Sequence, residues 1–166
     1  MQDILFAEDS WVADVNPNDI VYTPDAVAKM IVDEFKPTGR ILEPCKGGGA
    51  FMRYLPEGSE WCEIREGRDF FEFKEPVDWI VSNPPYSNWE RWLAHSFEIA
   101  TNIVYLVPIA KVFKSMGTVR SIYEYGGIVK ALFMPAGKAG FPFGFPCGAF
   151  HFQRGYKGPM ESRVVG

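Results

Sequence analysis

Two short stretches combine residue types that could do chemistry, and the sharper of them is Asn83-Pro84-Pro85-Tyr86. The apolar residues just before it, 79–81, predict a short buried strand. Two consecutive prolines allow neither a helix nor a strand ladder to continue, so the chain must turn rigidly. The turn presents an amide and an aromatic ring at the carboxyl end of a strand, where ligands bind in open α/β sheets. The alternative is a Pro-Pro turn with an internally satisfied Asn83.

The second stretch, residues 40–51, predicts a strand that ends at Glu43, a glycine-rich turn, and a helix that begins within 50–55. Glycine lets the backbone approach a ligand closely. The phosphate-loop pattern is absent because Lys46 precedes the glycines and no hydroxyl follows it, and Met52 occupies the third position of a dinucleotide fingerprint. The turn therefore predicts a ligand site of another kind.

Together these stretches resemble the S-adenosylmethionine-dependent amino-methyltransferases, and in particular the adenine-N6 DNA methyltransferases. In that family the Asn oxygen and the carbonyl of the next Pro, here Asn83 and Pro84, accept both hydrogens of the target amino group. The aromatic residue, here Tyr86, stacks on the extruded base. The resemblance covers residues 22–153. Small enzymes of this appearance are typical of phages and mobile elements, and restriction-modification is an expected role.

The resemblance implies S-adenosylmethionine as cofactor, S-adenosylhomocysteine as product, and no metal. Glu43 would face the sulfonium and the amine. Glu63 lies near the end of a predicted strand at 61–64 and would bind the ribose hydroxyls, with Glu60 and Glu66 as competitors. The expected cofactor contacts are Tyr22, Thr23, Pro24, Glu43, Pro44, Cys45, Gly47, Gly49, Glu63, Asp69, Phe70 and Asn83; the catalytic turn comprises Asn83, Pro84, Pro85 and Tyr86.

Two further segments have a functional and a plain structural interpretation. In the resembled family an Asp beside a bulky apolar residue, here Asp69 and Phe70, binds the cofactor adenine; the alternative is a capped turn above core phenylalanines. Thr23-Pro24-Asp25 predicts a helix start, with Thr23 as N-cap and Pro24 at the first helical position. In the family a Thr-Pro turn contacts the methionine end of the cofactor.

The substrate is expected to lie against the second half of the chain. Residues 1–82 carry 8 Lys and Arg against 17 Asp and Glu, whereas residues 83–166 carry 9 against 4, which predicts a basic face for a polyanion. The loop 135–148 is rich in Gly, Pro and Phe. In the resembled family an aromatic loop before the last strand helps to hold the flipped base; the alternative is a rigid loop whose rings cap the core. The expected substrate contacts are Tyr86, Phe143 as first choice of the loop, Phe141 as second, Lys111, Lys114 and Lys138.

The predicted fold is α/β, a Rossmann-like class I methyltransferase with a seven-stranded, mostly parallel sheet, helices on both faces and an antiparallel last hairpin. Strands are expected at 103–108, 128–134 and 149–153, and a helix near 117–125. No regular helix fits between Glu63 and Asp78. We expect an arm over residues 1–21 and a single domain over 22–166, without a separate recognition domain.

Composition limits the class of protein. Of 166 residues, 47% are apolar and 23% charged, as in a globular protein, and no apolar run suffices for a membrane span. The acidic N-terminus differs from a signal peptide. Three scattered cysteines predict reduced thiols, no zinc site and a cytoplasmic protein. The resemblance implies that the host is a bacterium or a phage-infected cell. His95, on a predicted helix, is expected to be structural.

The predicted function is methyl transfer to the N6 amino group of adenine, flipped out of duplex DNA. Recognition of a DNA sequence would then come from loops, from a homodimer or from a recognition subunit. RNA adenine and protein glutamine are alternative substrates, because an amide nitrogen has the same delocalised lone pair. A cofactor-binding accessory subunit without catalysis is the alternative from another class.

Overall fold

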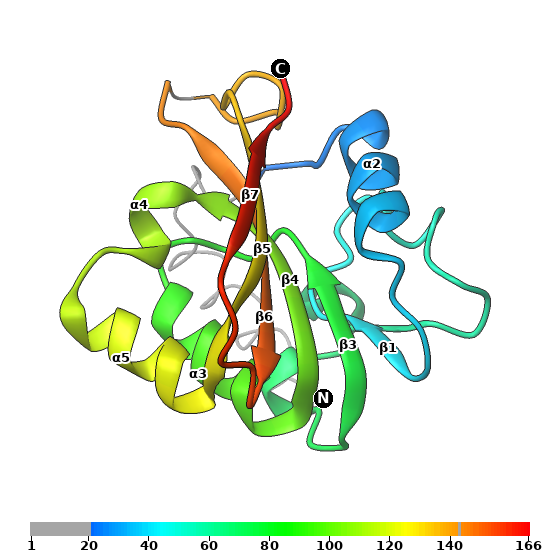
Figure 1. The fold of residues 1–166 in the computed structure, drawn as a ribbon. Helices are drawn as coiled ribbons and strands as arrows, with labels where there is room; N and C mark the ends of the chain where they lie inside the picture. Colours follow the sequence, from blue (N-terminus) through cyan, green and yellow to red (C-terminus); the bar gives the residue numbers. More distant parts are fainter. Residues whose placement is uncertain (1–20, 143) are drawn as a thin grey trace.

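One mixed sheet runs through the centre of the molecule (Figure 1). The computed structural model describes residues 21–142 and 144–166. Within them, seven strands pair in the order β2-β1-β3-β4-β6-β5-β7. They are β1 (Ile41–Glu43), β2 (Glu60–Trp61), β3 (Val77–Ser82), β4 (Ala100–Pro108), β5 (Gly126–Met134), β6 (Cys147–Arg154) and β7 (Glu161–Val164).

The strand directions confirm a mostly parallel sheet. β2, β1, β3 and β4 run parallel to one another, and β7 is parallel to β5. β6 is antiparallel to both β4 and β5, so β5 and β6 form the predicted hairpin. The hairpin is not the last element, because β7 follows it and adds an exposed edge strand. Its sequence, Glu-Ser-Arg-Val, has no buried face that could have revealed it.

The position of β1 creates the crevice in which the candidate site lies. The chain passes from β1 to β2 on one side and then returns to β3 on the other side of β1. Ile41 pairs with Trp79 and Leu42 with Ile80, so both strands end at the same edge of the sheet. Such a reversal of strand order is the usual ligand site of an open α/β sheet.

Helices cover both faces of the sheet, as predicted (Figure 1). They are α2 (Asp25–Phe35), α3 (Trp89–Ile99), α4 (Ile109–Val112) and α5 (Met116–Tyr125), with α2 on one face and the other three on the opposite face. Alternation along β6 serves both faces: Phe152 lies 6.5 Å from Phe97 of α3, while His151 lies 5.8 Å from Phe35 of α2, ring centre to ring centre.

Two predicted helix starts are wrong. α2 begins at Asp25 rather than Pro24; Pro24 occupies the N-cap position without a side-chain cap, and Thr23 bonds elsewhere. The helix expected within 50–55 consists only of turns, because Pro56 ends the segment before a second helical turn can form.

The region between β2 and β3 has only two short 3-10 turns, Ile64–Glu66 and Phe70–Glu72, in agreement with the prediction that no regular helix fits there. β2 is shorter than predicted and ends at Trp61, so Glu63 follows the strand instead of belonging to it. His95 is structural as expected: it is buried, and its Nε2 lies within 3.1 Å of two backbone carbonyls. All three cysteines are free.

Gly126, at the start of β5, offers a test of how tightly the β5–β6 hairpin is packed. A Cβ atom there would lie 1.9 Å from the carbonyl oxygen of Gln153, and backbone cannot yield as a side chain can. We expect Gly126→Ala to lower the free energy of unfolding by about 2–3 kcal/mol. The measurement is urea denaturation.

Gly117→Ala is the matched control, because its Cβ would lie 3.5 Å from the nearest atom within α5. It should raise the free energy of unfolding by about 0.4–1 kcal/mol. Equal stability of Gly126→Ala and the wild type would contradict the packing argument.

Candidate functional site

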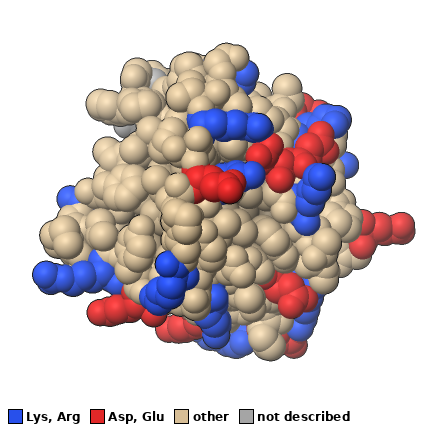
Figure 2. Space-filling view, viewed as in Figure 1, with Lys and Arg blue, Asp and Glu red and all other residues tan. Residues whose placement is uncertain are grey.

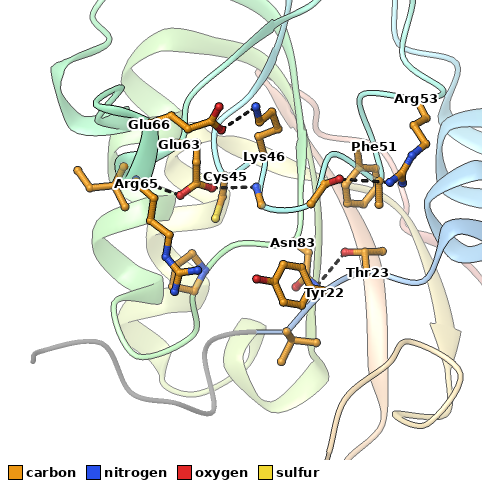
Figure 3. Close-up of a pocket in the computed structure, with 16 residues that line it drawn as sticks. Tyr22, Thr23, Cys45, Lys46, Phe51, Arg53, Glu63, Arg65, Glu66 and Asn83 are labelled. Atoms are coloured by element: carbon orange, nitrogen blue, oxygen red, sulfur yellow. Dashed lines mark hydrogen bonds and ion pairs between the residues drawn. The ribbon is translucent and has the colours of Figure 1, made fainter. Parts of the chain in front are cut away.

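A cavity of about 530 Å³ opens at the carboxyl ends of β1 and β3 (Figure 3). Its volume falls within the range of small-molecule sites, which is roughly 300–1,000 Å³. Four stretches far apart in the sequence line it: residues 21–23 before α2, the loop at 45–53, the turn at 63–66, and Asn83 with Pro85 after β3. The glycine-rich loop and the Asn-Pro-Pro-Tyr turn therefore share one cavity.

The loop after β1 owes its shape to its glycines. Gly47 has φ +51° and Gly49 has φ +81°, a region that disfavours residues with a Cβ. The N–H of Gly47 donates to Oε2 of Glu63 over 2.8 Å, and the N–H of Lys46 donates to the carbonyl of Cys62 over 2.9 Å. These bonds fasten the loop to the segment after β2, so that its backbone forms one wall of the cavity.

Glu63 lies at the cavity wall, after β2. One carboxylate oxygen accepts from Gly47 and the other from the N–H of Arg65 over 3.2 Å. Each oxygen has a second lone pair, so the carboxylate can still accept bonds from a ligand. Neighbouring Ile64 also lines the cavity and is 43% exposed, which gives this wall an apolar surface beside an acceptor.

Asn83 occupies the point where the cavity meets the Asn-Pro-Pro-Tyr turn. Its Nδ2 donates to Oγ1 of Thr23 over 3.1 Å, and its Oδ1 accepts from the hydroxyl of Tyr86. Tyr86 is buried and meets the ring of Phe141 edge to face, with 5.3 Å between centres. The structure therefore brings together Thr23, Asn83, Tyr86 and Phe141 from three separate segments.

Glu43 lies at the end of β1 with 1% of its surface exposed, and it does not line the cavity directly. Its Oε1 accepts from the N–H of Cys45 over 2.8 Å and from the hydroxyl of Ser82 at the end of β3. Burial raises the pKa of Glu43 to about 8, against the lowering effect of those two hydrogen bonds. The carboxyl group is therefore largely protonated at neutral pH, and it is hydrogen-bonded to Cys45 of the cavity lining.

Several predicted contacts lie outside the cavity lining. Asp69 caps its own turn by accepting from the N–H of Phe71 over 2.9 Å, and Phe70 is buried against Trp92, with 4.8 Å between ring centres. This agrees with the alternative of a capped turn above the core. Pro24, Pro44, Gly49 and Pro84 flank lining residues without belonging to the lining themselves. Phe143 lies outside the described residues.

Other lining residues were not predicted. Lys46, which had no expected role, pairs with Glu66 over 2.7 Å and lies 3.7 Å from the centre of the Trp61 ring. Arg53 donates to the carbonyl of Gly48 over 3.2 Å at the opposite end of the cavity (Figure 3). Phe51 and Arg65 complete the walls. Only their proximity in sequence to the glycines or to Glu63 could have indicated them.

The described part of the chain shows neither a cluster of three His, Cys, Asp or Glu side chains suited to a metal ion nor a helix long and apolar enough to cross a membrane. The three predicted lysines lie away from the cavity lining. Lys114 pairs with Glu90 over 2.8 Å at the start of α3, and Lys138 donates to the backbone oxygen of Gly166. The first of these contacts places Lys114 next to the helix that follows the Asn-Pro-Pro-Tyr turn.

No family model matches the chain, and no curated protein matches it. Solved structures do match. A presumed class I S-adenosylmethionine-dependent methyltransferase from Listeria monocytogenes aligns with a TM-score of 0.68 and 12% identity over 91% of this chain and 67% of its own. The type I restriction-modification system methyltransferase subunit from Streptococcus thermophilus aligns with a TM-score of 0.61 and 17% identity over 81% of this chain and 45% of its own. The M protein of the type I restriction enzyme EcoKI aligns with a TM-score of 0.63 and 13% identity over 80% of this chain and 44% of its own.

These similarities show the fold and leave the activity to be argued from the site. The chain spans less than half the length of the two restriction-enzyme subunits. The predicted fold is confirmed: the chain has the Rossmann-like fold of the class I methyltransferases.

Proposed function

We propose that this protein transfers a methyl group from S-adenosylmethionine to the N6 amino group of adenine in DNA. One observation carries the proposal: Asn83, the amide of the Asn-Pro-Pro-Tyr turn, lines the same cavity as the glycine-rich loop. A cofactor on that loop and an amino group held by Asn83 would then meet within one crevice. The matching folds, which include methyltransferase subunits of restriction enzymes, support this assignment.

The cofactor would occupy the cavity from Tyr22 to the turn after β2. The Gly47 loop would contact the centre of the molecule through its backbone, and Glu63 would accept the ribose hydroxyls. Ile64, exposed beside Glu63, is better placed than Phe70 to pack on the adenine ring, because Phe70 is buried under α3. Tyr22 and Thr23 would contact the methionine end.

The chemistry requires little beyond positioning. The adenine amino group is a weak nucleophile because its lone pair is delocalised into the ring. Hydrogen bonds to Oδ1 of Asn83 and to the carbonyl of Pro84 would favour a tetrahedral nitrogen whose lone pair points at the methyl group. The nitrogen then forms the C–N bond, the sulfur keeps the electron pair of the broken C–S bond, and the extra proton leaves to water. Orientation and preorganised acceptors account for such rate increases.

DNA would approach over the turn and the segments beside it. Lys111 and Lys114 both act on Glu90, whose pKa is lowered chiefly by its hydrogen bond from Lys114. In the view of Figure 2 the basic and acidic side chains are mixed and separated by broad uncharged areas, so a basic surface for DNA on this face would be local. We propose that Lys111 and Lys114 contribute to it, that Tyr86, Phe141 and Phe143 contact the flipped base, and that a second subunit assists recognition.

The direct experiment offers labelled S-adenosylmethionine together with duplex DNA, single-stranded DNA, RNA or total protein, and compares the wild type with Asn83→Ala. We expect label in adenine of duplex DNA. Because the bond to Asn83 strengthens in the transition state, Asn83→Ala should lower the single-turnover rate about 100-fold or more while cofactor affinity stays nearly constant. Transfer at the wild-type rate by Asn83→Ala would refute the proposed site, and label in RNA or protein would refute the proposed substrate.

Cofactor binding should depend on Gly47. Its Cβ would point toward the ring of Tyr22, 3.9 Å away, and a valine would fill the cavity and strain a backbone with positive φ. We expect Gly47→Val to weaken S-adenosylhomocysteine binding more than about tenfold, or 1.4 kcal/mol, in calorimetry. Gly58→Val is the matched control, because Gly58 has φ +86° but lies outside the cavity lining. Equal loss in both variants would mean that strain alone is responsible.

Glu43 should make cofactor binding dependent on pH. The positive sulfonium of S-adenosylmethionine stabilises the ionised form of Glu43, so binding of this ligand would release the proton of the Glu43 carboxyl group. The uncharged sulfur of S-adenosylhomocysteine would not. Since the free-protein pKa is about 8, the affinity ratio of the two ligands should rise between about pH 6 and about pH 9, by roughly 3- to 10-fold, and then level off. Calorimetry of both ligands across this range checks it. Glu43→Gln should make the affinity ratio independent of pH, whereas the control Glu57→Gln, at an exposed residue, should leave its pH dependence unchanged. A wild-type ratio that does not change with pH would exclude this role of Glu43.

A further inference from the structure

We propose that Thr23 is a positioning residue, which holds the amide of Asn83 with its oxygen directed at the target amino group. This inference rests on the proposed function and adds a residue to it. The observation behind it is the pair of hydrogen bonds that fix the amide from both sides: Nδ2 to Oγ1 of Thr23 over 3.1 Å, drawn as a dashed line in Figure 3, and Oδ1 from the hydroxyl of Tyr86.

The direction of the amide matters because its two ends have opposite hydrogen-bonding character. The oxygen of Asn83 can only accept and its nitrogen can only donate. If the amide turned over, its nitrogen would face the amino group of the substrate, so that two donors would meet and the acceptor would be lost. A residue that prevents this rotation therefore acts on the reaction although it need not touch the reacting atoms.

The two hydroxyls are unequal, which selects one direction of the amide. A phenol is a better donor and a weaker acceptor than an aliphatic alcohol, because its ring withdraws electron density from the oxygen. Tyr86 is therefore suited to donate to Oδ1, and the hydroxyl of Thr23 is suited to accept from Nδ2. When the amino group of the substrate bonds to the second lone pair of Oδ1, the bond from Nδ2 to Thr23 holds the amide at its other end.

The surroundings of Thr23 keep it in place. The following Pro24 fixes its own φ and restricts the backbone of Thr23. Gly140, with φ +82°, packs so closely on Pro24 that a Cβ would lie 2.9 Å from the proline ring. Next to it, Phe141 contacts the ring of Tyr86. Thr23 of the segment before α2 thus bonds to Asn83, and Phe141 of the loop before β6 packs on Tyr86, while Pro24 and Gly140 of the same two segments pack against each other.

The test combines two substitutions of Thr23 with Asn83→Ala in single-turnover methyl transfer to duplex DNA at saturating cofactor. Thr23→Val keeps the shape of the side chain but cannot accept a hydrogen bond, and it should lower the rate about 5- to 10-fold, the effect of one neutral hydrogen bond. Thr23→Ser keeps the hydroxyl and should recover most of the rate. Thr38→Val, at an exposed threonine between α2 and β1, controls for the loss of a hydroxyl.

The double variant separates positioning from other roles. In the Asn83→Ala protein there is no amide to hold, so Thr23→Val should cause no further loss. An equal loss with and without Asn83, or no recovery by Thr23→Ser, would overturn the inference, because Thr23 would then act through the cofactor or the fold. If the wild type methylates DNA and Thr23→Val does so at the same rate, the inference about Thr23 is overturned and the proposed function stands. A wild type without transfer to any substrate would overturn the proposed function and the inference with it.

Discussion

The parallel pairing of β1 with β3 is the constraint on which the candidate site depends. It aligns two strands from distant parts of the sequence so that Glu43 and Ser82, their last residues, are joined by a hydrogen bond. The glycine-rich loop follows the end of β1, and the Asn-Pro-Pro-Tyr turn follows the end of β3. A shift of the register by one residue would turn the side chains of β3, including Ser82, to the other face of the sheet and would move Asn83 relative to the glycine-rich loop. The geometry of the cavity is therefore a property of the sheet more than of its loops.

The sequence predicted most of the fold because its strongest signals are local. Apolar runs identified β3, β4 and β5, and the helix expected near 117–125 is α5, which begins one residue earlier, at Met116. The two prolines and the glycines likewise predicted turns that the structure has, at positions where Gly47 and Gly49 require positive φ. Local patterns failed where tertiary contacts decide the conformation. β7 exists because the edge of β5 accepts it, and Thr23 leaves its expected capping role because Asn83 offers it a partner 60 residues away.

The composition of the site was less predictable than the fold. An acidic residue beside an aromatic one is equally consistent with an adenine site and with a capped turn over the core. In the structure Asp69 caps the turn and Phe70 is buried. Ile64 had no motif of its own, because its exposure follows from the end of β2 at Trp61 and from the 3-10 turn that begins at Ile64. Which side chain faces a cavity depends on where a short strand stops, and that varies by one or two residues without any clear sequence signal.

The closed arrangement of Asn83 suggests how the site could favour the transition state over the bound substrate. A half-buried amide left without partners would cost roughly 1–3 kcal/mol, and Thr23 and Tyr86 remove that cost before any ligand arrives. Oδ1 already accepts from the Tyr86 hydroxyl, so an amino group that reaches its second lone pair bonds to a partly satisfied acceptor, and substrate binding gains little from it. The bond becomes more favourable only as the nitrogen turns tetrahedral and its hydrogens more acidic. Interactions that strengthen in this way raise turnover instead of merely tightening the ground-state complex. Affinity for the target would then have to come from ring contacts and from the nucleic-acid backbone, while the amide is reserved for the chemical step.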